Sequence, residues 1–156
     1  MERGGSSPPA GLIPVIKFSK KNPSVELPSY QSGGAAGMDI RAFLADDHII
    51  PPMGRARIPT GLFAEVEPGY ELQIRPRSGL ADRFGITVLN SPGTIDSNYR
   101  GEIEVILINL GKDEFRVKNG ERIAQMVMAR AARADIIEGE LTETKRGGEG
   151  FGSTGV

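Results

Sequence analysis

The sequence has no cysteine, no tryptophan and only one histidine among its 156 residues. The lack of cysteine excludes disulfides, thiolate nucleophiles and thiolate metal sites together, and it fits a reducing compartment. The single histidine, His48, cannot build a specific Ser/His/Asp triad, and we expect it in a surface loop. No apolar run resembles a signal peptide or approaches the length of a membrane span. We therefore expect a soluble, cytoplasmic protein.

The chain also lacks a large excess of charge of either sign, because it has 19 basic and 20 acidic residues and a net charge of -1. A chain of this kind lacks the net positive charge that would attract nucleic acid or an anionic membrane. An anionic ligand would therefore need a local site. The length indicates one domain with a core of useful size.

Glycine and proline are abundant, at 21 and 11 residues, which indicates many turns and an all-β chain. One short helical turn is expected at residues 78–85, with Ser78 as its N-cap and Gly85 as its stop. Residues 85–90 and 102–109 predict one long hairpin, and a second hairpin is predicted at the Asn119-Gly120 step. Strand-forming stretches lie at residues 14–18, 39–43, 56–66, 70–77, 85–90, 102–109 and on both sides of that step. The fold class predicted is an antiparallel, jelly-roll-like distorted β-barrel with long loops.

Composition divides the chain into three parts. Residues 1–12 are mostly Gly, Ser and Pro, which predicts a disordered leader. Residues 13–140 carry the strand pattern and form the predicted β-barrel domain. Residues 141–156 form a predicted flexible C-terminal arm, and five of its last eleven residues are glycine.

The arm contains a G-x-G-x-x-G pattern at residues 150–155, around the aromatic Phe151. A dinucleotide site needs a strand before this pattern and a helix after it, and neither is expected here. The composition by itself favours a disordered tail with no function. A glycine-rich arm can nevertheless bind an anion through successive backbone N–H groups, helped by a bidentate Arg146. Phe151 would then stack on something flat.

Four further stretches combine polar groups with permissive backbone, and each also has a plain structural explanation. Asp39 reads as a turn cap. Arg77 and Ser78 at a helical start predict either an anion cradle or an ordinary N-cap. Asp96 is harder to explain, since aspartate is depleted in strands. Gln125 would face water on an alternating strand.

Taken together, five segments in this order resemble the five motifs of the trimeric deoxyuridine triphosphatases (dUTPases). The segments are GAAGMDIRA (34–42), PRSGLA (76–81), GTIDSNYRGEI (93–103), GERIAQM (120–126) and RGGEGFGSTG (146–155). The resemblance implies hydrolysis of dUTP to dUMP and pyrophosphate. It also implies a homotrimer with active sites shared between subunits, the C-terminal arm closing a neighbour's site, and Mg²⁺ bound mostly by the triphosphate and water.

The resemblance also implies a role for individual residues. Asp96 matches the aspartate that orients and deprotonates the attacking water, and Tyr99 matches the tyrosine that packs on the deoxyribose and excludes a 2′-hydroxyl. Asp39 matches a residue near the metal's water shell. The uracil pocket would comprise Asn90, Gly93, Thr94, Ile95 and the main chain of Glu104. The phosphates would meet Arg77, Ser78, Gly79 and Gln125, and the closing arm would supply Arg146, Phe151, Gly152, Ser153 and Thr154.

Two positions depart from the family pattern, and two other functions remain as alternatives. Asn98 stands where many members carry Asp, and Glu149 stands where glycine is usual and adds a negative charge to the arm. A dCTP deaminase would carry a glutamate at the place of Ile106, which cannot shuttle a proton. A non-catalytic nucleotide-binding trimer would be expected to lose Asp96 or the arm, and both are present.

Overall fold

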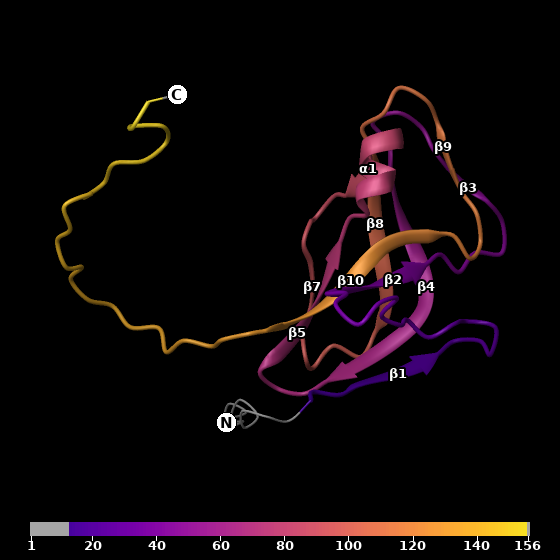
Figure 1. Ribbon diagram of the computed structural model, residues 1–156, viewed down its shortest axis with the longest axis horizontal. Helices are drawn as coiled ribbons and strands as arrows, with labels where there is room; N and C mark the ends of the chain where they lie inside the picture. The colour runs from indigo at the N-terminus through magenta and orange to yellow at the C-terminus, as the bar shows by residue number, and fades with distance from the viewer. Residues whose placement is uncertain (1–12, 156) are drawn as a thin grey trace.

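The computed structural model of the protein describes residues 13–155, so the predicted leader at residues 1–12 lies outside the described part. Strands dominate this part, with one short helix between them (Figure 1). The elements follow in the order β1 (Ile16–Lys20), β2 (Gly37–Arg41), β3 (His48–Ile50), β4 (Arg55–Val66), β5 (Tyr70–Arg75), α1 (Ser78–Phe84), β6 (Ile86–Val88), β7 (Gly93–Ile95), β8 (Glu102–Asn109), β9 (Phe115–Val117) and β10 (Arg122–Arg130).

Two four-stranded sheets carry most of the chain, in the orders β1-β4-β8-β6 and β2-β10-β5-β7, and β3 pairs with β9 beside them. All of these pairings are antiparallel. Non-consecutive strands lie side by side in both sheets, as in a jelly roll. The predicted all-β, jelly-roll-like fold with one short helix is confirmed.

The core lies between the two sheets, because alternate residues of each strand point inward. Ile103, Val105 and Leu107 of β8 are buried, as are Leu72 and Ile74 of β5. These side chains belong to one hydrophobic cluster with the inward residues of β2, β4 and β10. Burying each of them stabilises the fold by about 1.5–3 kcal/mol before entropy is counted. The outward residues of the same strands are free to carry polar chemistry.

The hairpin predicted at the Asn119-Gly120 step is wrong. The turn is there, but β9 pairs with β3, whereas β10 pairs with β2 and β5. Other partners hold the turn: Asn119 Oδ1 accepts the Leu44 N–H at 2.9 Å, and the Gly120 N–H donates to Ala42 O at 2.8 Å. Tertiary contacts at the end of β2 therefore replace the local pairing.

Two smaller expectations also need correction. The N-cap of α1 is Arg77, with extended backbone, and Ser78 is the first helical residue. Gly85 does end the helix, in the left-handed conformation with φ of 68°. His48 begins strand β3 rather than lying in a loop, although it is exposed. By contrast, the hairpin predicted between residues 85–90 and 102–109 is present as the β6–β8 pairing.

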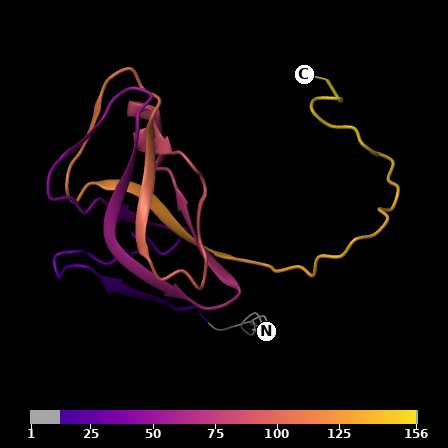
Figure 2. The same cartoon turned by 180° about the vertical axis from the view of Figure 1, so that it is seen from behind.

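The C-terminal segment leaves the sandwich after β10. Residues 131–155 form neither helix nor strand, and almost all of them are exposed. Figures 1 and 2 show this segment running away from the sheets in both views. No helix within residues 13–155 is long and apolar enough to cross a membrane.

Candidate functional site

A charged corner forms where β2, β10 and the start of α1 meet. Asp39 of β2 lies opposite Gln125 of β10, which lies opposite Arg75 of β5. Arg77 Nε donates to Asp39 Oδ1 at 3.0 Å, and Arg122 Nη1 lies 3.5 Å from Asp39 Oδ2. The Asp39 side chain is only 23% exposed, so this pairing is partly shielded from water. We call Asp39, Arg77, Arg122 and Gln125 the Asp39 corner.

Gln125 does not simply face water, as an alternating strand would predict. Its Nε2 donates to the Pro76 carbonyl at 3.0 Å, which ties β10 to the connection between β5 and α1. Its Oε1 lies 2.8 Å from the position that a Cβ on Gly37 would take. Glycine at position 37 therefore makes room for this amide. The corner is held together by side chains from three of the predicted motifs.

The start of α1 presents polar groups outward. Ser78 and Gly79 are exposed, and no side-chain hydrogen bond caps the helix. A Cβ on Gly79 would meet nothing within 4 Å, so packing within the described chain does not require glycine there. By contrast, a Cβ on Gly93 would lie 3.2 Å from Ile74 Cβ, so packing alone explains that glycine.

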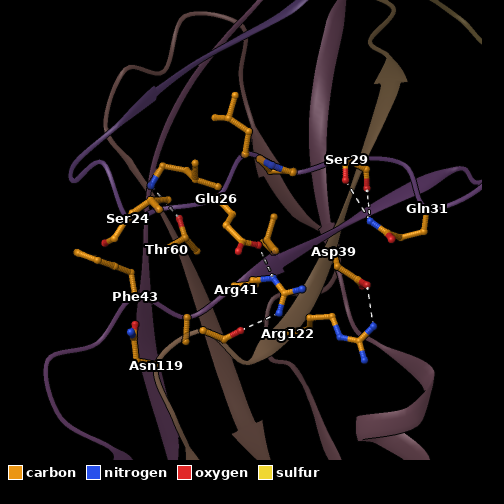
Figure 3. Close-up of a pocket in the computed structure, with 17 residues that line it drawn as sticks. Ser24, Glu26, Ser29, Gln31, Asp39, Arg41, Phe43, Thr60, Asn119 and Arg122 are labelled. Atoms are coloured by element: carbon orange, nitrogen blue, oxygen red, sulfur yellow. Dashed lines mark hydrogen bonds and ion pairs between the residues drawn. The ribbon is translucent and has the colours of Figure 1, made fainter.

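A cavity of about 330 Å³ adjoins the Asp39 corner between the loop at residues 24–31, β2 and the turn before β10. Figure 3 shows Asp39 and Arg122 facing one another across a dashed contact at one side of it, with Arg41 and Glu26 beside them. A more open hollow of about 820 Å³ between α1 and β9 shares Arg41 and Arg122 and adds Arg77. The corner is thus open to solvent on two sides, and arginines line both openings.

A second polar group lies at the other edge of the same sheet. Strand β7 pairs with β5 on one side and has no strand partner on its other side among the described residues. An edge strand of this kind presents unpaired N–H and C=O groups. Asp96 follows the strand directly and is exposed. We call residues 96–102 the Asp96 loop.

The loop folds back on itself. The Tyr99 N–H donates to Asp96 O at 3.1 Å, and the Tyr99 hydroxyl donates to Glu102 O at 3.0 Å. Arg100 Nη1 donates to Ser97 O at 2.7 Å and to Tyr99 O at 3.1 Å. The positions of Asp96 and Tyr99 are therefore set within the described chain before any ligand is present.

The residues predicted for a uracil pocket gather near β7. Asn90 Nδ2 lies 3.5 Å from the position of a Cβ on Gly93. The Leu89 N–H donates to Ile106 O at 2.9 Å, continuing the β6–β8 register, so Asn90 and Glu104 belong to the same end of this hairpin. The Glu104 carboxylate points elsewhere and pairs with Arg57 at 3.1 Å, which leaves its main chain as the part near Asn90.

The Asp39 corner and the Asp96 loop are not one site within this chain. Asp39 lies on β2 and the Asp96 loop follows β7, the two edge strands of a four-stranded sheet, whereas Arg122 and Gln125 lie on β10 and Arg77 follows β5 between them. Three strand spacings of about 4.8 Å separate those edges, or about 14 Å across the sheet. The two regions also differ in position along the strands. Asp39 lies in the same row as Arg75 of β5, through Gln125, whereas Ile95, the residue before the loop, pairs with Leu72 of β5. The chain therefore carries two separate polar regions, which we call candidate half-sites.

The five arm residues predicted to bind nucleotide lie away from both half-sites. Arg146, Phe151, Gly152, Ser153 and Thr154 are all exposed in the C-terminal segment. Within the described residues Arg146 makes a local contact, with Nε donating to Glu149 O at 2.9 Å. Phe151 has a positive φ of 52°, followed by Gly152 at 82°. The segment holds small turns but no contact with the sheets that would place it.

Three residues of these half-sites were missing from the sequence prediction. Arg122 pairs with Asp39, and Arg100 and Glu102 hold the Asp96 loop. A signal was present, since all three lie inside the segments GERIAQM and GTIDSNYRGEI. Their partners are far apart in sequence or belong to the backbone, so side-chain type alone did not reveal their role.

No group of three or more His, Cys, Asp or Glu side chains that could hold a metal ion occurs within residues 13–155. Asp39 is the carboxylate that the corner supplies, and its two oxygens face Arg77 and Arg122. A metal ion held mainly by protein ligands does not fit these residues. They do fit an ion whose ligands come mostly from a bound polyphosphate and water.

Comparison with known proteins indicates one family. A dUTPase sequence model matches residues 23–155. The deoxyuridine 5'-triphosphate nucleotidohydrolase of Wolinella succinogenes is 57% identical over 141 residues, covering 90% of this chain and 93% of that protein. The corresponding protein of Brucella melitensis is 51% identical over 154 residues, covering 97% of this chain and 96% of that protein.

A solved structure shares the fold. The dUTPase of Staphylococcus bacteriophage 80alpha, a mutant with dUpNHpp, superposes with a TM-score of 0.81 at 22% identity, covering 91% of this chain and 99% of that one. At this level of identity the likeness concerns the fold. The family is shown by the sequence model, which matches most of the chain, and by the two relatives, which are more than 50% identical to it. The chain belongs to the dUTPase family.

Proposed function

We propose that the protein hydrolyses dUTP to dUMP and pyrophosphate, using active sites shared between the subunits of a homotrimer. Membership of the dUTPase family supports the reaction. The observation that carries the shared site is the separation of the Asp39 corner from the Asp96 loop at opposite edges of one sheet. Because the two polar regions lie apart on one chain, we infer that a second copy brings the other half to the same nucleotide.

The open edge of β7 is suited to uracil. This base presents an acceptor–donor–acceptor edge, which backbone N–H and C=O groups of Gly93–Ile95 complement, with Asn90 and the main chain of Glu104 beside them. A site that hydrogen-bonds uracil in this way rejects cytosine, because buried partners would be left unpaired. The loop then places Tyr99 against the sugar and Asp96 next to the phosphates.

The reaction is an in-line displacement at the α-phosphorus. The water oxygen bonds to phosphorus as the bond to the α,β-bridging oxygen breaks, and pyrophosphate leaves. Positioning and charge neutralisation dominate such transfers. Asp96 holds the water and accepts a proton from it, although an aspartate is a weak base at neutral pH, so alignment carries much of its contribution. Arg77, Ser78, Gly79 and Gln125 cradle the phosphates from the Asp39 corner.

Mg²⁺ fits this arrangement as an ion carried by the triphosphate. When bound, it would neutralise charge on the phosphate oxygens. Asp39 would reach its water shell rather than the ion itself, because both carboxylate oxygens are already paired with arginines. The protein's own residues then bind the nucleotide through Arg77 and Gln125.

The C-terminal arm is the part that closes the site. Its glycines allow backbone N–H groups to point together at an anion, and Arg146, Ser153 and Thr154 add donors. Gly152 with its positive φ lies directly after Phe151, which is free to stack over the base. The arm of one subunit closing a neighbour's site accounts for its lack of contact with its own sheets.

The first test compares pyrophosphate release from dUTP, dCTP, dTTP and UTP with Mg²⁺. We expect release from dUTP alone. Asp96→Asn should lower kcat by about 10²–10⁴-fold while dUTP binding changes little, because the general base and water-aligning group is lost. Absence of release from dUTP would reject the proposal. Ammonia from dCTP would mean a deaminase despite Ile106.

The shared site is tested by mixing two inactive variants. One carries Asp96→Asn, and the other ends after Lys145. If one site takes its loop and its arm from different subunits, mixed trimers should recover about a quarter of wild-type activity. A site built within one chain would recover nothing. Mixing each variant with itself is the control.

A further inference from the structure

The Asp96 loop owes its shape to its own backbone. Arg100 donates to the carbonyls of Ser97 and Tyr99, and the Tyr99 N–H closes onto Asp96 O at 3.1 Å. These contacts lie within the loop, and the ion pair of Arg100 with Glu65 of β4, at 3.6 Å, is exposed and therefore weak. Something else must fix where the whole loop lies relative to the sheets.

Tyr99 rests on the last two residues of this loop. A Cβ added to Gly101 would overlap the Tyr99 ring, so the ring lies directly against the glycine backbone. The hydroxyl donates to the carbonyl of Glu102 at 3.0 Å. Tyr99 as a whole is 46% exposed. Its position is therefore set by the backbone at residues 101 and 102.

The side chain of Glu102 anchors that backbone to the interior. Its Oε1 accepts the Gly61 N–H at 2.9 Å, and its Oε2 lies 3.4 Å from Lys21 Nζ. Gly61 is buried, has a positive φ of 68°, and lies where the β4–β8 register shifts between Pro59 and Phe63. The Glu102 side chain is only 17% exposed. It satisfies an N–H that the irregular pairing leaves outside the β-ladder.

We propose that Glu102 is a positioning residue for substrate discrimination, holding Tyr99 in place from the buried bulge of β4. This inference rests on the proposed role of Tyr99 against the deoxyribose. Its carboxylate sets the start of β8, its carbonyl receives the tyrosine hydroxyl, and the ring thereby keeps the space that a 2′-hydroxyl would need. A ring that excludes a single oxygen atom must be fixed in position. Loss of the bond between Glu102 and the Gly61 N–H therefore lowers the discrimination between dUTP and UTP.

The geometry makes the length of the side chain matter more than its charge. Glutamine at position 102 keeps an oxygen that can accept the Gly61 N–H. Aspartate keeps the charge but is one methylene too short to reach it without moving the backbone. Alanine removes the acceptor altogether. These three substitutions separate anchoring from the ion pair with Lys21.

The experiment measures kcat/KM for dUTP and for UTP and takes their ratio. We expect Glu102→Ala and Glu102→Asp to lower the ratio by about three- to tenfold, as expected for one lost hydrogen bond. Glu102→Gln and the control Lys21→Met should keep it within about twofold of wild type. Tyr99→Phe should lower the ratio like Glu102→Ala, and the double variant should lower it no further, because both act through one chain of contacts.

The outcomes separate this inference from the function on which it rests. If Tyr99→Ala leaves the ratio unchanged, the proposed role of Tyr99 fails. If Tyr99→Ala lowers the ratio but Glu102→Ala and Glu102→Asp do not, the inference alone is overturned. Equal losses toward both nucleotides would also overturn it, since they indicate a general effect on folding. Should Glu102→Ala not fold, the Asp and Gln variants decide the matter.

Discussion

The Asp39 corner and the C-terminal segment carry similar chemistry in opposite physical states. Both present arginine, and both are predicted to bind phosphate. In the corner, Arg77 and Arg122 are already paired with Asp39, and Gln125 already bonds to Pro76 O. In the C-terminal segment, Arg146 contacts only its own turn, and Phe151 is fully exposed.

The difference teaches where each region's stability comes from. The corner is built on strands whose inner faces form the core, so its geometry costs nothing further when a ligand arrives. The C-terminal segment buries almost nothing, so under the proposed function it would be ordered by the nucleotide that it binds. A preformed corner would then align the phosphates, and an arm that closes late would allow access before closure and exclude water after it.

Removing the arm gives the largest expected effect and tests this contrast directly. A protein ending after Lys145 should lose about 10²–10³-fold in kcat/KM for dUTP, because several transition-state donors and the lid disappear. Its melting temperature without nucleotide should stay the same, since residues 146–155 add no element to the sandwich. Differential scanning calorimetry and pyrophosphate release measure the two quantities. A large drop in melting temperature would show that the arm belongs to the folded body.

Asp39→Asn should affect both stability and activity, unlike any change in the arm. Losing the charge opposite two arginines at a partly buried site should lower the free energy of unfolding by about 1–3 kcal/mol. The matched control is Asp47→Asn, whose side chain is 41% exposed and pairs with Arg116 at 3.3 Å. That pair should contribute at most about 1 kcal/mol. Urea denaturation of the protein without nucleotide measures the free energy of unfolding of both variants. Equal losses in Asp39→Asn and Asp47→Asn would contradict the idea of a preformed corner.

Phe151→Ala should separate closure from phosphate binding. We expect a fall of about tenfold in kcat/KM, because one aromatic stacking contact on the base is lost. The apo protein should be unchanged in stability. Limited proteolysis with a non-hydrolysable dUTP analogue checks the mechanism: the analogue should protect the wild-type arm and protect the variant less. Equal protection would remove Phe151 from the closing contact.

Glu149→Gly should produce the smallest effect. The Glu149 side chain is exposed, and its carbonyl already receives Arg146 Nε in the apo turn. Removing a negative charge near a triphosphate should lower KM by no more than about threefold, and less at high salt. Steady-state kinetics at two ionic strengths measure this. An effect larger than tenfold would place the carboxylate against the phosphates.

Much of the site could be predicted from sequence because its motifs are short and contiguous. Asp96, Tyr99 and Gln125 were proposed in this way, and their roles stay predictions. Most strands were found from the alternation that reflects one buried face. The second hairpin was wrong because Asn119 and Gly120 bond to the end of β2, more than 70 residues earlier in the chain. Arg122 and Glu102 were missed for the same reason, since their partners Asp39 and Gly61 lie far away in sequence. Arg100 was missed because it bonds to nearby backbone carbonyls, which side-chain type does not reveal.

The sequence by itself determined the family, the all-β class and the residue types at each motif, because periodicity, turn chemistry and motif order are all local properties. Only the tertiary structure decided that β2 and β7 form opposite edges of one sheet, and therefore that Asp39 and Asp96 belong to two separated candidate half-sites. It also decided that Glu102 reaches Gly61 across a bulge 41 residues away in sequence. Such contacts depend on how strands are ordered in a sheet, and strand order is set by the packing of the whole core.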